Sequence, residues 1–224
     1  MESKTPGFVL KKQNFGEADR ILRVFSAEFG LISVLAKGVK KTKSRKAGSL
    51  ELFGETNFRL HRRLGELFLV TETNPISAFE SKDLAVLKIA FAAGELLLQL
   101  APPEKPLPKI YKIFKNFLTI VVNPPVNWGV NRATTSKLQL LKIAFFAKVL
   151  AILGFLPNLE QFKIREQKLL KFLLENDFPR ILQLENNAQL FTWAEKFLVQ
   201  LLENSAEKFS RVAAATQNWL ESSR

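Results

Sequence analysis

The chain has 224 residues, of which 47% are hydrophobic and 24% are charged, a balance that excludes wholesale disorder and allows one large or two small cores. Its 33 Lys and Arg outnumber 21 Asp and Glu, which gives a formal charge of +12, so nucleic acid, an acidic protein surface or anionic lipid are the expected partners. With no cysteine, disulfides, thiolate zinc sites and cysteine nucleophiles are excluded.

The sequence carries no sign of membrane targeting. Residues 1–6 lack the apolar stretch of a signal peptide, and charged residues interrupt the longest apolar runs at Lys88, Glu95, Lys142 and Lys148. We therefore expect no membrane partner and a cytoplasmic location.

Residues 1–80 show the alternation of apolar and polar side chains that is typical of short strands. Strands are expected at 8–10, 21–25, 31–36, 55–62 and 67–71. Five short strands favour a small closed barrel, and the OB-fold is the leading candidate because it is a five-stranded barrel that holds single strands. The 20 phenylalanines, taken as a set, are expected to fill the core.

From about residue 81 the apolar period changes to about 3.6, as in an amphipathic helix. In the first such helix, the apolar side that is expected to be buried carries Leu84, Leu87, Phe91, Gly94, Leu98 and Ala101. Further helices are expected at 106–122, from 135 to either 154 or 157, and at 161–175, 187–203 and 205–222. The predicted fold is therefore α+β, with an OB-fold barrel over residues 1–80 and an α-helical domain over 81–224.

The densest positive charge lies between the third and fourth expected strands. Six of the ten residues from 37 to 46 are cations and none is acidic: Lys37, Lys40, Lys41, Lys43, Arg45 and Lys46. A loop of this composition can follow a phosphate backbone, where each neutralised phosphate releases counterions. Arg62 and Arg63 on the fourth expected strand could extend this nucleic-acid-binding surface.

A second basic region has no acidic residue between Glu104 and Glu160. On a helical wheel, Lys105, Lys109, Lys112 and Lys115 span about 120°, opposite the apolar side of the expected helix. An ordinary solvated face usually carries compensating carboxylates. We therefore expect an acidic partner or DNA to bind here, through Lys105, Lys109, Lys112, Arg132 and Lys137.

No catalytic or cofactor motif is apparent. The lone His61 has no second histidine or cysteine with which to bind a metal, and neither of the glycine-rich phosphate-binding motifs occurs. We expect no enzyme activity, no cofactor and no metal site.

Several runs together resemble the N-terminal OB domain of bacterial RecO. They are Phe15 to Leu22 (Phe-Gly-Glu-Ala-Asp-Arg-Ile-Leu), Glu28 to Ser33 (Glu-Phe-Gly-Leu-Ile-Ser), Ala36 to Gly38 and Lys43 to Gly48. A weaker match, from Phe146 to Leu159, is similar to the central helix of that family and its Gly-aromatic-x-Pro exit. Many members carry a four-cysteine zinc module after this exit, and its cysteines are absent here.

This resemblance implies a DNA repair and recombination mediator. Such a protein binds single- and double-stranded DNA, anneals complementary strands and helps recombinase to load onto DNA coated by single-strand binding protein. The implied partners are RecR and the acidic C-terminal tail of the single-strand binding protein, and the implied location is the bacterial cytoplasm, at the nucleoid. Two alternatives remain open: an OB-fold RNA-binding protein, or a helical adaptor for acidic protein partners.

Overall fold

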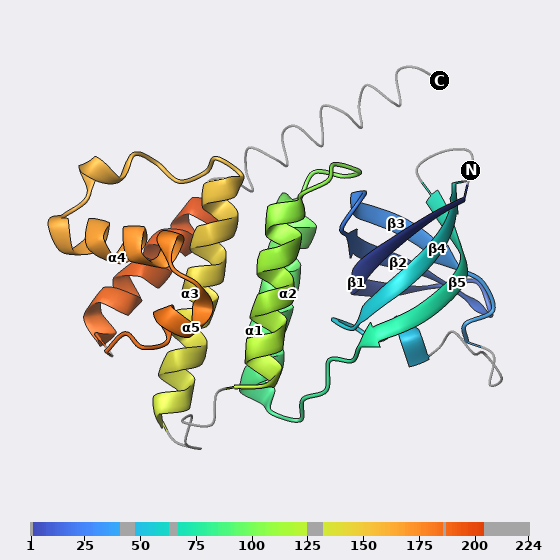
Figure 1. Ribbon diagram of the computed structural model, residues 1–224, viewed down its shortest axis with the longest axis horizontal. Helices are drawn as coiled ribbons and strands as arrows, with labels where there is room; N and C mark the ends of the chain where they lie inside the picture. Colours follow the sequence, from blue (N-terminus) through green and yellow to red (C-terminus); the bar gives the residue numbers. More distant parts are fainter. Residues whose placement is uncertain (1, 41–47, 63–66, 125–131, 186, 204–224) are drawn as a thin grey trace. The chain divides into compact units, whose positions relative to one another are not determined.

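The computed structural model describes residues 2–40, 48–62, 67–124, 132–185 and 187–203. Five strands form a closed barrel in the order β1-β2-β3-β5-β4 (Figure 1), and all neighbours are antiparallel except β3 and β5. They are β1 (Glu2–Phe15), β2 (Asp19–Ser26), β3 (Gly30–Ala36), β4 (Glu55–Arg62) and β5 (Leu67–Ser77), with a short 3-10 helix η1 (Gly48–Leu50) before β4. The predicted five-stranded OB-fold barrel is confirmed.

The barrel core follows from the alternation of the strands. Every second residue of β2 and β3 points inward, so Leu22, Val24, Ile32 and Val34 lie in one buried apolar cluster. Val39, which follows β3, belongs to the same cluster and is 4% exposed.

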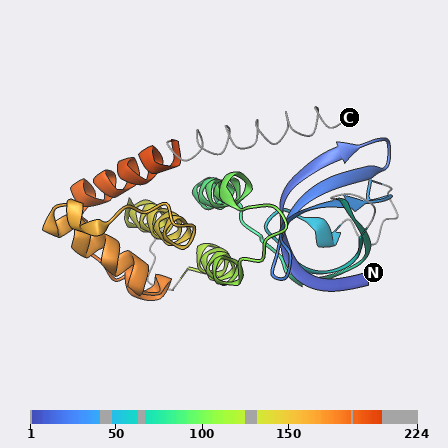
Figure 2. The same cartoon turned by 90° about the horizontal axis from the view of Figure 1, so that it is seen from above.

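Two helices pack on the outside of the barrel within the same compact unit, Met1–Trp128 (Figure 2). They are α1 (Leu84–Leu100), which begins at the N-cap Asp83, and α2 (Pro108–Val122). Outward-facing Phe8 of β1 lies 5.2 Å, centroid to centroid, from the rings of both Tyr111 and Phe114. Phe25 of β2 packs on the same two rings, so α2 covers part of the β1–β2 surface.

The segment between the two helices is also fixed to the barrel. Pro103 forms a parallel bridge with Leu31, and the Glu104 N–H donates to the Leu31 carbonyl at 3.0 Å. Gly30 has φ of +68°, and a Cβ there would lie 2.0 Å from the Lys105 carbonyl oxygen. Only glycine therefore allows the start of β3 to approach this segment.

One buried carboxylate joins β4 to α2. Glu55 is 2% exposed, and its carboxylate accepts a hydrogen bond from the Tyr111 hydroxyl at 2.9 Å and pairs with the Lys115 ammonium at 2.7 Å. Burial, and then the charge and hydrogen bond of Glu55, raise the pKa of Tyr111 far above its ordinary value.

We expect the Tyr111 hydroxyl to stay protonated in the folded protein well above pH 10. Tyrosine in an unfolded chain ionises near pH ~10, so above that pH the unfolded state binds fewer protons and stability falls as pH rises. Tyr111 is the only tyrosine, so the ultraviolet absorbance of tyrosinate follows this one group. Ionisation near pH ~10 without unfolding would contradict the buried hydrogen bond to Glu55.

The remaining residues belong to a second compact unit, Gly129–Arg224, whose described part is helical. It contains α3 (Arg132–Ile152), η2 (Leu159–Gln161), α4 (Ile164–Glu175), α5 (Phe178–Ile181) and a helical segment over 188–203. Its core includes the fully buried residues Leu141, Phe145, Leu170, Leu173 and Ile181. The helical region of the predicted fold is confirmed, and the helix expected at 205–222 lies outside the described residues.

Along the sequence, the last strand of the barrel ends at Ser77 and α1 begins at Leu84, so the boundary expected at residue 80 falls between these two elements. The first compact unit nevertheless continues to Trp128, because α1 and α2 pack on the barrel. Within the described ranges, no helix has both the length and the apolar character that a membrane span requires.

Candidate nucleic-acid interface

The outer surface of β1, β2 and β3 is divided into a covered part and an exposed part. Lys11 lies opposite Arg23, and Arg23 lies opposite Ser33, so these side chains share one face of the sheet. This face points outward, because the neighbouring Leu22 and Val24 point into the core. We call the exposed cations Lys11 and Lys37, together with the half-buried Arg23, the basic barrel face.

Lys37 joins this face because it follows the inward-pointing Ala36 at the end of β3. Lys11 and Lys37 are exposed, and the Arg23 guanidinium donates to the Ser33 hydroxyl at 2.6 Å, which holds it across β2 and β3. In an OB-fold, the outer surface of strands 2 and 3 is a common site for oligonucleotides. Lys11 and Arg23 were not predicted as binding residues. The strand expected at 8–10 stopped short of Lys11, so the strand expected at 21–25 contained Arg23 without its neighbour on β1.

The β1–β2 turn anchors the start of the basic loop. The Gly38 N–H donates to the Asp19 carboxylate at 2.8 Å, and the Lys40 N–H donates to the Ala18 carbonyl at 3.0 Å. Between them, Val39 inserts into the barrel core, which leaves Lys37 and Lys40 exposed on either side. The first two predicted cations therefore project from a fixed backbone.

The far flank of the basic loop is fixed as well. Leu50 of η1 is buried in the barrel core, the Ser49 hydroxyl donates to the Thr73 hydroxyl at 2.6 Å, and the Thr56 hydroxyl donates to the Ser49 carbonyl at 2.5 Å. The predicted residues between the two anchors, Lys41, Lys43, Arg45 and Lys46, lie outside the described residues.

The predicted extension on β4 has a different setting. Arg62 pairs with Glu104 at 2.7 Å, and its guanidinium lies 5.1 Å from the centre of the Phe68 ring. One hydrogen-bonding edge of this arginine is therefore occupied, although its side chain is 52% exposed. Arg63 lies outside the described residues.

The five cations predicted to bind an acidic partner are not gathered on one element. Lys105, Lys109 and Lys112 are exposed on or just before α2, in the first compact unit. Lys137 is half-buried on α3, in the second unit, and the side chain of Arg132 at the start of α3 lies outside the described residues.

Residues 105–159 contain no acidic side chain, but some of their lysines pair with acidic residues from elsewhere in the chain. Lys115 pairs with Glu55, and Lys142 and Gln139 both donate to Glu195. Burial alone would raise the pKa of the Glu195 carboxyl, but the hydrogen bonds from Lys142 and Gln139 hold it below its ordinary value. In the folded chain, acidic residues from outside 105–159 therefore neutralise part of the positive charge of this segment.

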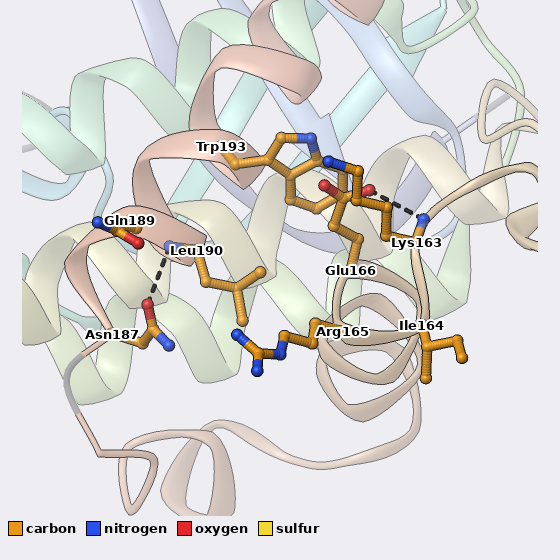
Figure 3. Close-up of a pocket in the computed structure, with 8 residues that line it drawn as sticks. All are labelled: Lys163, Ile164, Arg165, Glu166, Asn187, Gln189, Leu190 and Trp193. Carbon is orange, nitrogen blue, oxygen red and sulfur yellow. Dashed lines mark hydrogen bonds between the residues drawn. The ribbon is translucent and has the colours of Figure 1, made fainter.

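A cavity of about 690 Å³ lies within the second unit, between α4 and the helical segment 188–203. In Figure 3, Leu190 and Trp193 point toward the α4 side chains, and the Arg165 guanidinium points back toward Asn187. Trp193 stacks on Phe197 at 5.5 Å and meets Phe162 edge-on, so its ring is held in place. The cavity combines the cations Lys163 and Arg165 with an apolar wall. It lies outside residues 105–159, the segment without acidic residues in which we expected the acidic partner to bind.

Comparison with known proteins agrees with this architecture. Residues 1–79 match the family described as Recombination protein O N terminal. The chain is similar to the DNA repair protein RecO of Dehalococcoides mccartyi, with 31% identity over 169 residues, 75% of this chain and 62% of that protein. It is similar to the protein of the same name from Pelotomaculum thermopropionicum, with 30% identity over 70% of this chain and 57% of the relative. For Listeria monocytogenes serotype 4b the identity is 31%, over 70% of this chain and 58% of the relative. The chain thus spans roughly three fifths of the length of these relatives.

Proposed function

This chain belongs to the RecO family, and we propose that it is a DNA repair and recombination mediator that binds single- and double-stranded DNA and anneals complementary strands. On this proposal it also helps recombinase to load onto DNA coated by single-strand binding protein. It acts by binding rather than by catalysis, and its place is the bacterial cytoplasm, at the nucleoid.

The observation that carries the proposal is that the basic loop starts from a fixed backbone beside the basic barrel face. The β1–β2 turn joins the two strands that carry Lys11 and Arg23, and the same turn holds the backbone from which Lys37 and Lys40 project. Cations on a rigid scaffold neutralise phosphates with little ordering cost, and the net charge of +12 attracts DNA over longer distances.

The proposed partners are RecR and the acidic C-terminal tail of the single-strand binding protein. The cavity beside Trp193 supports the second of these, because Lys163 and Arg165 can pair with carboxylates while Leu190 and Trp193 offer apolar contact. The predicted cations remain a second proposal for the acidic tail, as two separate groups: Lys105, Lys109 and Lys112 in the first compact unit, and Arg132 and Lys137 in the second.

Three fluorescent probes test the proposal against its two alternatives: a single-stranded DNA, an RNA of the same sequence, and an acidic peptide that ends in an apolar residue. Anisotropy titrations at several salt concentrations should show DNA binding that weakens as salt rises. Equal affinity for the RNA would favour an RNA-binding protein. Weak DNA binding with tight peptide capture would favour a helical adaptor.

A further inference from the structure

One phenylalanine is placed unlike most others in the chain. Phe15 ends β1 at the tip of the β1–β2 hairpin and is 51% exposed, whereas Phe25, Phe58, Phe114 and Phe117 are fully buried. The chain reverses directly after it at Gly16, whose φ is +60°. Among the described residues no other aromatic ring packs against Phe15.

The surroundings of Phe15 are polar rather than apolar. It lies opposite Asp19, the residue whose carboxylate holds the Gly38 N–H at the start of the basic loop. Asn14, Gly16 and Glu17 beside it are all exposed. The ring is therefore a single apolar surface among polar groups, which is too small to dock a folded protein.

A ring in this place suits an unpaired nucleobase. Proteins that hold single strands pair cationic side chains, which follow the phosphates, with aromatic rings, on which bases stack. Here Lys37 and Lys40 are the cationic side chains, and the β1–β2 turn anchors the backbone between them. Phe15, the last residue of β1 before that turn, is the aromatic ring. Bases in a duplex are already stacked on each other, so they cannot use such a ring without being unpaired.

We propose that Phe15 is a stacking platform for one base of single-stranded DNA whose phosphates are bound by Lys37 and Lys40. This rests on the proposed DNA-binding function and adds to it a physical basis for preferring single strands. The preference comes from one exposed ring, while the binding of both forms of DNA comes from the cations.

The test compares Phe15→Ala and Phe15→Trp with the unchanged chain, on single-stranded and duplex DNA of one sequence. Loss of one stacked base should weaken single-strand binding about tenfold, leave duplex binding within about twofold, and leave the salt dependence unchanged. Phe15→Trp should keep the affinity, and single-stranded DNA should quench its fluorescence beyond any change seen in the unchanged chain. Ile76→Ala, which removes another exposed apolar side chain of the barrel, should bind like the unchanged chain.

Three results would overturn the inference. Phe15→Ala could bind single strands as tightly as the unchanged chain, or it could lose affinity for single strands and duplex equally, or Phe15→Trp could show no added quenching. Each of these leaves the DNA-binding function intact. If the unchanged chain binds no single-stranded DNA, the proposed function itself is wrong, and the stacking role falls with it.

Discussion

Replacing Lys40, Lys41, Lys43 and Arg45 together by alanine should weaken single-stranded DNA binding roughly a hundredfold at moderate salt and flatten its salt dependence. If the six cations of residues 37–46 each contact one phosphate, the slope of log K against log salt is about −4. Removing four of the contacts leaves a slope of about −1.4. The backbone anchors at Gly38 and Lys40 do not involve the deleted side chains, so the barrel should remain folded.

The matched control removes the same amount of charge elsewhere. Lys82, Lys88, Lys168 and Lys171 are all exposed and lie on or near helices away from the loop sequence. Their combined replacement by alanine changes the net charge equally, so it should reduce affinity only slightly and leave the slope near that of the unchanged chain. A loop variant with an unchanged slope would remove residues 40–45 from the DNA-binding site.

We expect Glu55→Ala to cost the first compact unit about 2–4 kcal/mol of unfolding free energy. The change leaves the Tyr111 hydroxyl buried without its acceptor and empties the space between β4 and α2. The ammonium of Lys115 adds little to this cost, because the Lys115 side chain is 47% exposed and can be hydrated. Chemical denaturation measures the loss.

Two variants separate the buried hydrogen bond from general effects. Glu72→Ala also removes a carboxylate paired with a cation, Arg59, but the Glu72 side chain is 47% exposed and its loss should cost less than ~1 kcal/mol. Tyr111→Phe deletes only the hydroxyl and should cost about 1–2 kcal/mol. Equal stability of Glu55→Ala and Glu72→Ala would show that Glu55 does not fasten α2 to the barrel.

The barrel could be predicted from the sequence because apolar residues recur at every second position of its strands. Leu22, Val24, Ile32 and Val34 show this period, and the structure places all four inside. The docking of α2 could not be predicted. In the sequence, Phe8 and Phe25 belong to continuous apolar runs, so nothing there shows that their outer face is covered by a helix. The contact that explains these residues involves Tyr111 and Phe114, about a hundred residues along the chain.

The face of α1 was predicted incorrectly in part. The sequence indicated burial of Leu84 and Phe91, which are 63% and 50% exposed, whereas Val86, Ile89, Ala93 and Leu97 form the buried face. Apolar residues occur nearly all around this helix, so more than one set fits a period of 3.6 and the periodicity cannot select one.

Sequence reasoning predicted the cations of the candidate site that lie close together in the sequence. It missed the cations that become neighbours only through strand pairing. Lys37 and Lys40 stand in a visible run of cations, while Lys11 and Arg23 become neighbours only through the β1–β2 register. Phe15 was absorbed into the expectation that phenylalanine fills the core. Its position beside Gly16 at a turn was the signal that it would be exposed.

The most direct test of the mediator function is a strand-annealing measurement. Complementary fluorescent oligonucleotides are mixed in EDTA without nucleotide, and duplex formation is followed with and without the protein. We expect faster annealing that declines as salt rises, because cations of the barrel and its loop bring two strands together without metal or ATP. No acceleration by a demonstrably folded protein would contradict strand annealing and favour the adaptor or RNA-binding alternatives.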